Sequence, residues 1–236
     1  MLTSYQDQNL ANVREDTQKA LINTRKDRTS PTTDRVENNR VKIYQENLFP
    51  TKIFIADDVL EKKHIDVMKK DTIKLTKLHP YGLNNSKSNW QSHTNLHHEK
   101  IYQPLVEKIK LTTEKYFFKM SWKVKKYKIT SMWSNILKPN EMNRPHTHCN
   151  TILSGVYYLE SNPQAPPIHF YDPRAQAKVL IPDFTQNTIE NSDIWTYPSI
   201  VNRMLVFPSW LEHYVPVNNS NKDRISLSWD IVLTIS

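Results

Sequence analysis

Three histidines have the residue type and spacing that could hold one metal ion. His146 and His148 lie two residues apart in the segment PHTH, and on an extended chain such residues point to the same face. His213 begins a predicted strand 65 residues after His148 and could supply a third imidazole. The alternative is a surface pair, with His213 as a half-buried ring that bonds only to backbone.

A second candidate for chemistry is the basic residue of the segment RISLSW near the C-terminus. Arg224 and Ser226 share one face of the predicted strand. An inward-facing arginine among apolar neighbours needs an anion to offset its desolvation. The alternative for Arg224 is a surface ion pair.

The segments that carry these residues have the alternation of β-strands. From Tyr127 onward the pattern has a period of two, and the predicted strands are KYKITSMWSNIL, TILSGVYYL, IHFY, DIWTY, RMLVF, HYVPV and RISLSWDIVLTI. No helical pattern separates them, so we expect an antiparallel jelly roll or a closed double-sheet barrel. Turns must rely on asparagine, as at Asn140 and Asn202, because the chain has only two glycines.

Two helices are predicted before the strands, which makes the fold class α+β. The first begins after Asp57 or Asp58 as N-cap and runs to about Lys77, and the second spans about 99–118. Residues 1–45 are polar and lack apolar periodicity, so they predict a flexible, disordered tail with at most a marginal helix near Leu10–Ile22. We therefore expect one domain over 46–236, with helices at about 57–120 and a barrel at about 127–236.

Composition narrows the function classes. A single cysteine excludes an intramolecular disulfide framework and a CxxC zinc site. No secretory leader or transmembrane run is apparent, so we expect a soluble, intracellular protein. Residues 61–128 contain sixteen lysines, no arginine and six acidic residues, which indicates a solvated helical face. A nucleic-acid partner is possible but not favoured, because bidentate phosphate contacts use arginine.

The order of these features resembles the Fe(II)- and 2-oxoglutarate-dependent oxygenases, specifically a family common in marine bacteria and their phages. The resemblance covers about 46–236 and rests on LFPTKIF, the SNWQS segment, HTHCNTILSGVYYLES, IHFYDPR, LVFPSWLEHYVPV and RISLSWDIV. It implies a double-stranded β-helix in which His146 and His213 bind Fe(II). It also implies that Arg224 and Ser226 bind the distal carboxylate of 2-oxoglutarate. Asn135 is either a further cosubstrate ligand or a structural residue.

One departure concerns the remaining metal ligand. The wider superfamily has an Asp or Glu two residues after the first histidine, whereas this chain has His148. We favour His148 as the third ligand, and Asp172 in FYDPR is the carboxylate alternative. The resemblance implies hydroxylation of a C–H bond, coupled to conversion of 2-oxoglutarate to succinate and CO2.

Two other functions remain open at this point. One is a jelly-roll binding or assembly module without chemistry, since fold does not establish function. The other is a cupin-type dioxygenase with three histidines and no organic cosubstrate, which would not need Arg224. The substrate and the oligomeric state stay unknown. The expected location is the cytoplasm, or the host cytoplasm for a phage-encoded protein.

Overall fold

The computed structural model describes residues 42–83, 89–174, 176 and 179–234. The predicted helix near Leu10–Ile22, and with it most of the predicted tail, lies outside the described residues. Contacts divide the chain into the units Met1–Pro50 and Thr51–Ser236. In the described residues the helices are α2 (Lys62–Leu78) and α3 (Gln103–Lys119), with 3-10 turns at Leu96–His98 and Lys100–Tyr102. The strands are β1 (Phe54–Ala56), β2 (Trp90–Gln91), β3 (Tyr127–Leu137), β4 (Asn143–His146), β5 (Leu153–Glu160), β6 (Ile168–Tyr171), β7 (Ile194–Tyr197), β8 (Met204–Pro208), β9 (His213–Val215) and β10 (Arg224–Leu233).

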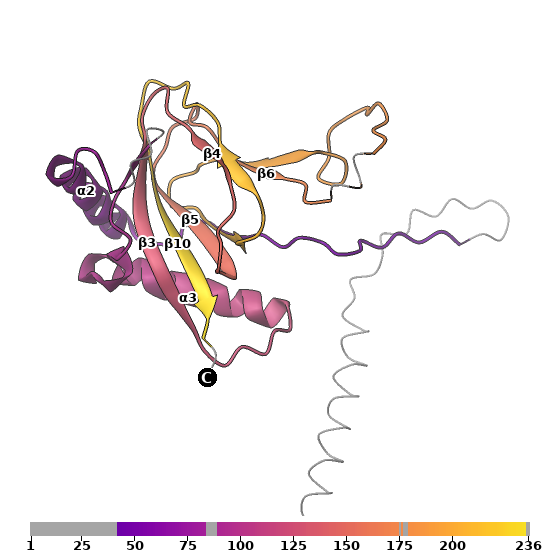
Figure 1. Ribbon diagram of the computed structural model, residues 1–236, viewed down its shortest axis with the longest axis horizontal. Helices are drawn as coiled ribbons and strands as arrows, with labels where there is room; N and C mark the ends of the chain where they lie inside the picture. The colour runs from indigo at the N-terminus through magenta and orange to yellow at the C-terminus, as the bar shows by residue number, and fades with distance from the viewer. Residues whose placement is uncertain (1–41, 84–88, 175, 177–178, 235–236) are drawn as a thin grey trace, which may run out of the picture. The chain divides into compact units, whose positions relative to one another are not determined.

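These strands form two antiparallel sheets that face each other (Figure 1). The larger sheet has the order β1-β8-β5-β10-β3-β2, and the smaller one has the order β4-β9-β6-β7. All seven strands predicted from alternation are present. The strand expected from the apolar segment LFPTKIFIADDVL is β1, and the structure adds β2 and the short β4. It confirms the α+β class with a jelly-roll barrel. In the larger sheet, β10 pairs with β3 on one side and with β5 on the other, so the strand that carries Arg224 is an interior strand.

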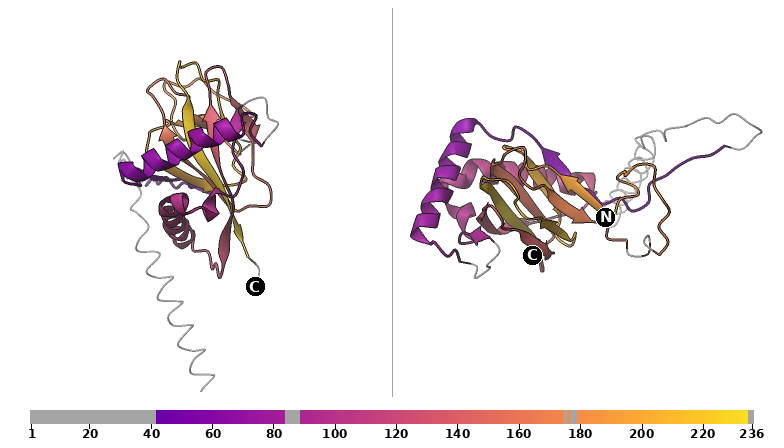
Figure 2. Two further views of the ribbon diagram at one scale, coloured as in Figure 1. Left: turned by 90° about the vertical axis from the view of Figure 1, so that its left-hand side faces the viewer. Right: turned by 90° about the horizontal axis from the view of Figure 1, so that it is seen from above.

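Both faces of the larger sheet are buried, each against a different layer. On the outer face, β5 and β10 pack against α2 and α3 through large side chains that include Met68, Ile109, Tyr157 and Trp229, and Figure 2 shows both helices on this side. On the inner face, Tyr158 and other residues of the larger sheet pack against Ile168 and Phe170 of the smaller sheet. Because strand side chains alternate, β10 contributes to the helix-facing core with one set and to the barrel interior with the other.

The first helix begins later than predicted, because both candidate N-caps have other roles. Glu61 is the N-cap of α2. Asp57 accepts two bonds from Arg203, at 2.6 and 2.8 Å, and Asp58 has a positive φ of 53°. A contact made by the tertiary fold thus replaces the local capping bond that the sequence suggests.

The second helix also begins later than its apolar spacing suggests. Pro104 lies in the first turn of α3, where its missing N–H is tolerated, but an α-helix that began near 99 would need that N–H to donate to the carbonyl oxygen of Lys100. The preceding residues from Leu96 to Tyr102 therefore form two 3-10 turns. Asn140 and Asn202 both have a φ of 68°, as expected for asparagine turns in a glycine-poor chain. Among the described residues, none of the helices has the length and apolar character needed to cross a membrane.

Candidate metal and cosubstrate site

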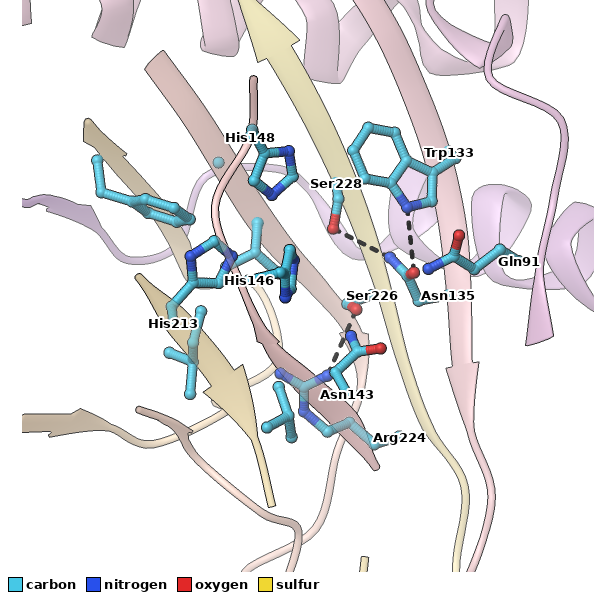
Figure 3. A pocket seen from close by; sticks show the side chains of 15 residues that line it. Gln91, Trp133, Asn135, Asn143, His146, His148, His213, Arg224, Ser226 and Ser228 are labelled. Atoms are coloured by element: carbon cyan, nitrogen blue, oxygen red, sulfur yellow. Dashed lines mark hydrogen bonds between the residues drawn. The ribbon is translucent and has the colours of Figure 1, made fainter. Parts of the chain in front are cut away.

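One pocket between the two sheets collects most of the polar residues singled out from the sequence (Figure 3). It encloses about 470 Å³, including solvent at its open mouth. Its walls are Gln91, Trp133, Asn135, Asn143, His146, His148, Gly155, Val156, Ile168, Phe207, His213, Val215, Arg224, Ser226 and Ser228. All six residues predicted for metal or cosubstrate binding are in this set.

The three histidines form the only group of potential metal ligands found in the described residues. One nitrogen from each of His146, His148 and His213 lies within 4.8 Å of the other two. Sheet pairing explains why distant residues meet, since His146 on β4 is opposite His213 on β9. Residues directly opposite in an antiparallel pair point to the same face. His148 follows β4 by two residues, and its backbone N–H donates to the carbonyl oxygen of Ser209 at 3.0 Å.

Each of the three imidazoles uses Nδ1 for a bond within the protein. Nδ1 of His146 lies 2.7 Å from the carbonyl oxygen of Arg144, and Nδ1 of His213 lies 2.9 Å from that of Leu211. A carbonyl oxygen can only accept, so each Nδ1 carries the proton and donates it. Nδ1 of His148 lies 2.8 Å from Oδ1 of Asp230. This pattern leaves the Nε2 atoms as the available ligand nitrogens, as in metal sites whose histidines are oriented by a second hydrogen bond.

Burial favours the neutral form of His213, which metal binding requires. His213 is 5% exposed, and burial lowers its pKa to about 3. The ring packs between Phe207 and Phe170, with centroid separations of 4.8 and 5.7 Å. These aromatic walls hold the imidazole in place and keep it unprotonated at neutral pH.

Arg224 lines the same pocket near Asn143, away from the three histidines (Figure 3), and is almost fully buried. Its side chain is 3% exposed, and Nη1 donates a long bond of 3.5 Å to Oγ of Ser226. Its Nε has no hydrogen-bond partner, and no carboxylate of the described residues lies within ion-pair distance of it. Burial lowers the pKa of Arg224, although guanidinium stays protonated in proteins. A buried cation without a counter-ion is suited to receive an anionic ligand.

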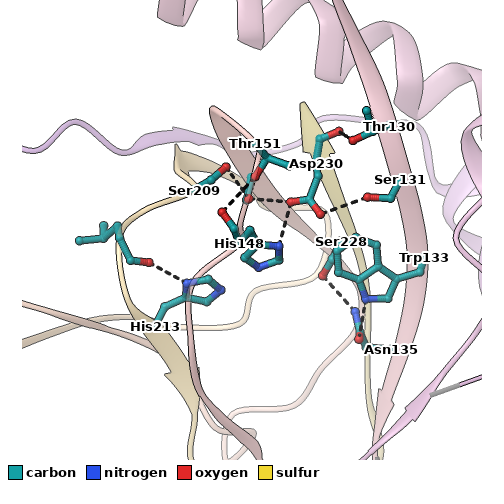
Figure 4. A network of polar contacts seen from close by, with 12 residues as sticks. Thr130, Ser131, Trp133, Asn135, His148, Thr151, Ser209, His213, Ser228 and Asp230 are labelled. Atoms are coloured by element: carbon teal, nitrogen blue, oxygen red, sulfur yellow. Dashed lines mark hydrogen bonds and ion pairs between the residues drawn. The ribbon is translucent and has the colours of Figure 1, made fainter. Parts of the chain in front are cut away.

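The inner face of β10 carries a ladder of four polar residues, spaced two apart: Arg224, Ser226, Ser228 and Asp230. Of these four, only Arg224 and Ser226 were candidate site residues from the sequence. Asp230 accepts from Ser154 at 2.7 Å and from Ser131 at 3.1 Å, in addition to its contact with His148 (Figure 4). The signal that could have found Asp230 is the same period of two, carried four residues past Ser226.

Asn135 belongs to a short polar chain that crosses from β3 to β10. Its Oδ1 accepts from Nε1 of Trp133 at 3.1 Å, and its Nδ2 donates to Oγ of Ser228 at 3.0 Å. The amide is therefore oriented by protein groups on both sides. Gln91 lies next to it, because β2 pairs Gln91 with Asn135.

The stretch that carries these side chains also matches a known family. Residues 131–230 match the family model described as "Putative 2OG-Fe(II) oxygenase". This stretch is similar to the 2-oxoglutarate/Fe(II) oxygenases. It contains the three histidines, Asn135 and Arg224, whereas α2 and α3 lie outside it. No curated protein sequence matches that of the chain.

Several solved structures share the fold of this domain. A Pseudomonas putida prolyl-4-hydroxylase aligns with a TM-score of 0.58 and 9% identity, covering 78% of this chain and 94% of its own. HygX from Streptomyces hygroscopicus, with nickel and 2-oxoglutarate bound, has a TM-score of 0.57 and 7% identity over 78% and 84% of the two chains. The viral collagen prolyl hydroxylase of Paramecium Bursaria Chlorella virus-1, in its 2-oxoglutarate complex, has values of 0.51 and 13% over 78% and 96%. At these identities the likeness shows the fold alone.

The carboxylate alternative for the third metal ligand, Asp172, does not lie with the histidines. Asp172 forms an ion pair with Arg174 at 2.9 Å and is not part of the group formed by His146, His148 and His213. A different carboxylate, that of Asp230, approaches the histidines, where it contacts Nδ1 of His148 at 2.8 Å.

Proposed function

We propose that the protein is an active Fe(II)- and 2-oxoglutarate-dependent hydroxylase. In the proposed reaction one oxygen atom of O2 enters a C–H bond of the substrate and the other enters succinate, with release of CO2. One observation carries the proposal: the buried, unpaired guanidinium of Arg224 and three imidazoles with available Nε2 atoms open into a single pocket. The match of residues 131–230 to the oxygenase family model supports the same reaction.

We infer that His146, His148 and His213 hold the metal. Their Nδ1 bonds orient three Nε2 lone pairs toward one another, and neutral imidazoles are good ligands for Fe(II). Bound there, Fe(II) would supply the redox chemistry that activates O2. The residues' own contribution is to fix the rings and to keep His213 unprotonated.

We infer that Arg224 binds the distal carboxylate of 2-oxoglutarate, with Ser226 as a neighbouring donor. A carboxylate here would give the unpartnered Nε its missing acceptor and neutralise a buried charge. Asn135, held by Trp133 and Ser228, would present its remaining amide hydrogen to the same ligand. The cosubstrate thus supplies the anion that the protein lacks at this point.

Arg224 also favours this function over the two alternatives left open by the sequence. A three-histidine dioxygenase without an organic cosubstrate does not need a buried cation in the metal pocket. A jelly-roll binding module does not need three oriented imidazoles. Burying the guanidinium of Arg224 without a counter-ion is costly for a domain that gains no ligand in return.

The decisive test is O2-dependent succinate formation. The full chain is reconstituted anaerobically with Fe(II), supplied with 2-oxoglutarate and exposed to O2. We expect slow succinate release even without substrate, and its loss, by at least about 100-fold, in His213→Ala because a buried ligand is removed. Equal succinate formation in both proteins would overturn the proposal.

His169→Ala is the matched control for that experiment. His169 is the residue before Phe170 on β6, so its ring lies on the face of the smaller sheet away from the pocket, 4.7 Å from the ring of Tyr214. Its removal should leave succinate formation within about twofold of wild type. A loss as large as that of His213→Ala would show that histidine removal acts through the fold rather than through the metal.

We further propose that residues 46–236 act as one oxygenase domain and residues 1–45 as an appendage to it. The cytoplasmic location expected from the sequence stays a prediction. The substrate is to be sought by assaying candidate compounds for stimulation of succinate release, since a bound substrate couples the two half-reactions.

A further inference from the structure

The structure assigns to Asp230 a role as the positioning residue of this metal site. We propose that it holds the ring of His148 with Nε2 directed at the ion, and that it supplies the negative charge that a carboxylate ligand provides in related sites. This inference rests on the proposed function, because it presupposes that the three histidines bind a metal. Asp230 would not touch the ion and would act through one imidazole.

The carboxylate of Asp230 is built into the sheet and cannot swing to the metal without breaking its bonds. Its register partners on the two neighbouring strands are Ser131 on β3 and Ser154 on β5. Both hydroxyls donate to it, at 3.1 and 2.7 Å. Oγ of Ser154 also lies 2.8 Å from Oγ of Ser209, which fixes that side of the network. Three strands, β3, β5 and β10, together with Ser209 just after β8, therefore set the position of the Asp230 carboxylate relative to His148.

The bonds to Asp230 indicate an ionised carboxylate. An ionised carboxylate accepts only, and Asp230 receives Ser131, Ser154 and His148. Since Asp230 can only accept, His148 keeps its proton on Nδ1 and its lone pair on Nε2.

Charge balance gives a reason for this arrangement. In a site with two histidines and one carboxylate, the divalent ion, the dianionic cosubstrate, the arginine and the carboxylate sum to zero. Three neutral imidazoles would leave the same assembly with one positive charge in excess. The carboxylate of Asp230, which is separated from the ion by the imidazole ring of His148, would bring the total charge back to zero. An imidazole that donates to a carboxylate is also a more basic ligand.

Metal affinity provides the first test, with Co(II) as the probe. Co(II) is titrated into the full chain under anaerobic conditions and followed by its visible absorption spectrum. We expect Asp230→Asn to weaken binding by about 10-fold and Asp230→Ala by about 10- to 100-fold. Asn keeps an acceptor for His148 but loses the charge, so it should have the smaller effect. Wild-type affinity in both variants would overturn the inference.

A double-mutant cycle separates an action through His148 from a general effect on the fold. In a His148→Ala background, Asp230→Asn should change Co(II) affinity by less than about twofold, because the ring through which it acts is gone. An equal loss in both backgrounds would overturn the inference. Asp71→Asn is the control: Asp71 accepts from Tyr102 at 2.9 Å outside the pocket, and this change should leave Co(II) binding unaltered.

Nitrogen NMR of the wild-type protein provides a test that needs no Asp230 variant to fold. In the Zn(II)-loaded chain, histidine spectra should show His148 bound to the metal through Nε2, with a slowly exchanging proton on Nδ1, and His148→Gln assigns the signals. Ligation through Nδ1 would overturn the role of Asp230 while leaving the proposed function intact. Failure of the wild type to bind Zn(II) or Co(II) at all would instead count against the proposed function itself.

Discussion

The guanidinium carbon of Arg224 lies 4.8 Å from the centre of the Tyr158 ring, over its face. This contact is the main electrostatic compensation that the protein itself offers to the buried charge, because a cation over an aromatic face is attracted by the ring quadrupole. Such a contact is weaker than a buried ion pair. The site therefore keeps Arg224 in place while leaving most of its hydrogen-bonding capacity for a ligand.

Replacing Arg224 with Met should remove 2-oxoglutarate binding and spare metal binding. Losing the partner of a buried charge costs about 2–5 kcal/mol, so we expect the affinity for 2-oxoglutarate to fall by at least about 30-fold in calorimetry with Mn(II) present. The ligand-free variant should be no less stable than wild type, because an apolar side chain replaces an uncompensated buried charge. Retained 2-oxoglutarate affinity would refute the cosubstrate role.

Arg203→Met is the matched control for this change. Arg203 pairs with Asp57 at 2.6 Å and is not among the residues that line the pocket. The substitution should leave 2-oxoglutarate affinity unchanged.

His148→Ala should weaken Co(II) binding by about 10-fold or more, whereas Asp172→Asn should leave it unchanged. The reason is position: a nitrogen of His148 lies within 4.8 Å of those of His146 and His213, while Asp172 is bonded to Arg174 at 2.9 and 3.0 Å. Equilibrium dialysis of the two variants checks the prediction. The reverse order of effects would identify Asp172 as the third ligand.

Asn135→Ala should raise the KM for 2-oxoglutarate by about 5- to 30-fold, which corresponds to a lost hydrogen bond of about 1–2 kcal/mol. Ser228→Ala removes only the group that accepts from the Asn135 amide, so its effect should be smaller and in the same direction. Initial-rate kinetics at varied 2-oxoglutarate concentrations measure both. An unchanged KM in Asn135→Ala would assign Asn135 a structural role.

Gly155→Ala should destabilise the domain by at least about 3 kcal/mol in denaturant unfolding, at the upper end of overpacking effects. A Cβ at this position would lie 2.1 and 2.4 Å from two ring atoms of Trp229, and 2.8 Å from the carbonyl oxygen of Leu205. Adding Trp229→Phe removes part of the clash, so the double variant should lose less than the sum of the two single changes. Simple additivity would contradict this account.

Local sequence patterns predict much of this protein because its strands alternate strongly. The period of two in RISLSWDIV correctly sends Leu227 and Trp229 to the helix-facing core and Arg224 and Ser226 to the barrel interior. The helix starts were predicted less well. Asp57 has the residue type of an N-cap, but its partner Arg203 lies far along the chain, and no local pattern reports that contact.

The sequence by itself determined which segments form strands and the class of the fold. It also determined which three imidazoles and which arginine are suited to metal and cosubstrate chemistry. Residue type and period are local properties, so short segments report them. Only the tertiary structure decided which carboxylate approaches the histidines. Asp172 was the carboxylate alternative that the sequence offered, yet it pairs with Arg174, while Asp230 contacts His148 from the last strand. That choice depends on the register between strands distant in sequence, which no short segment encodes.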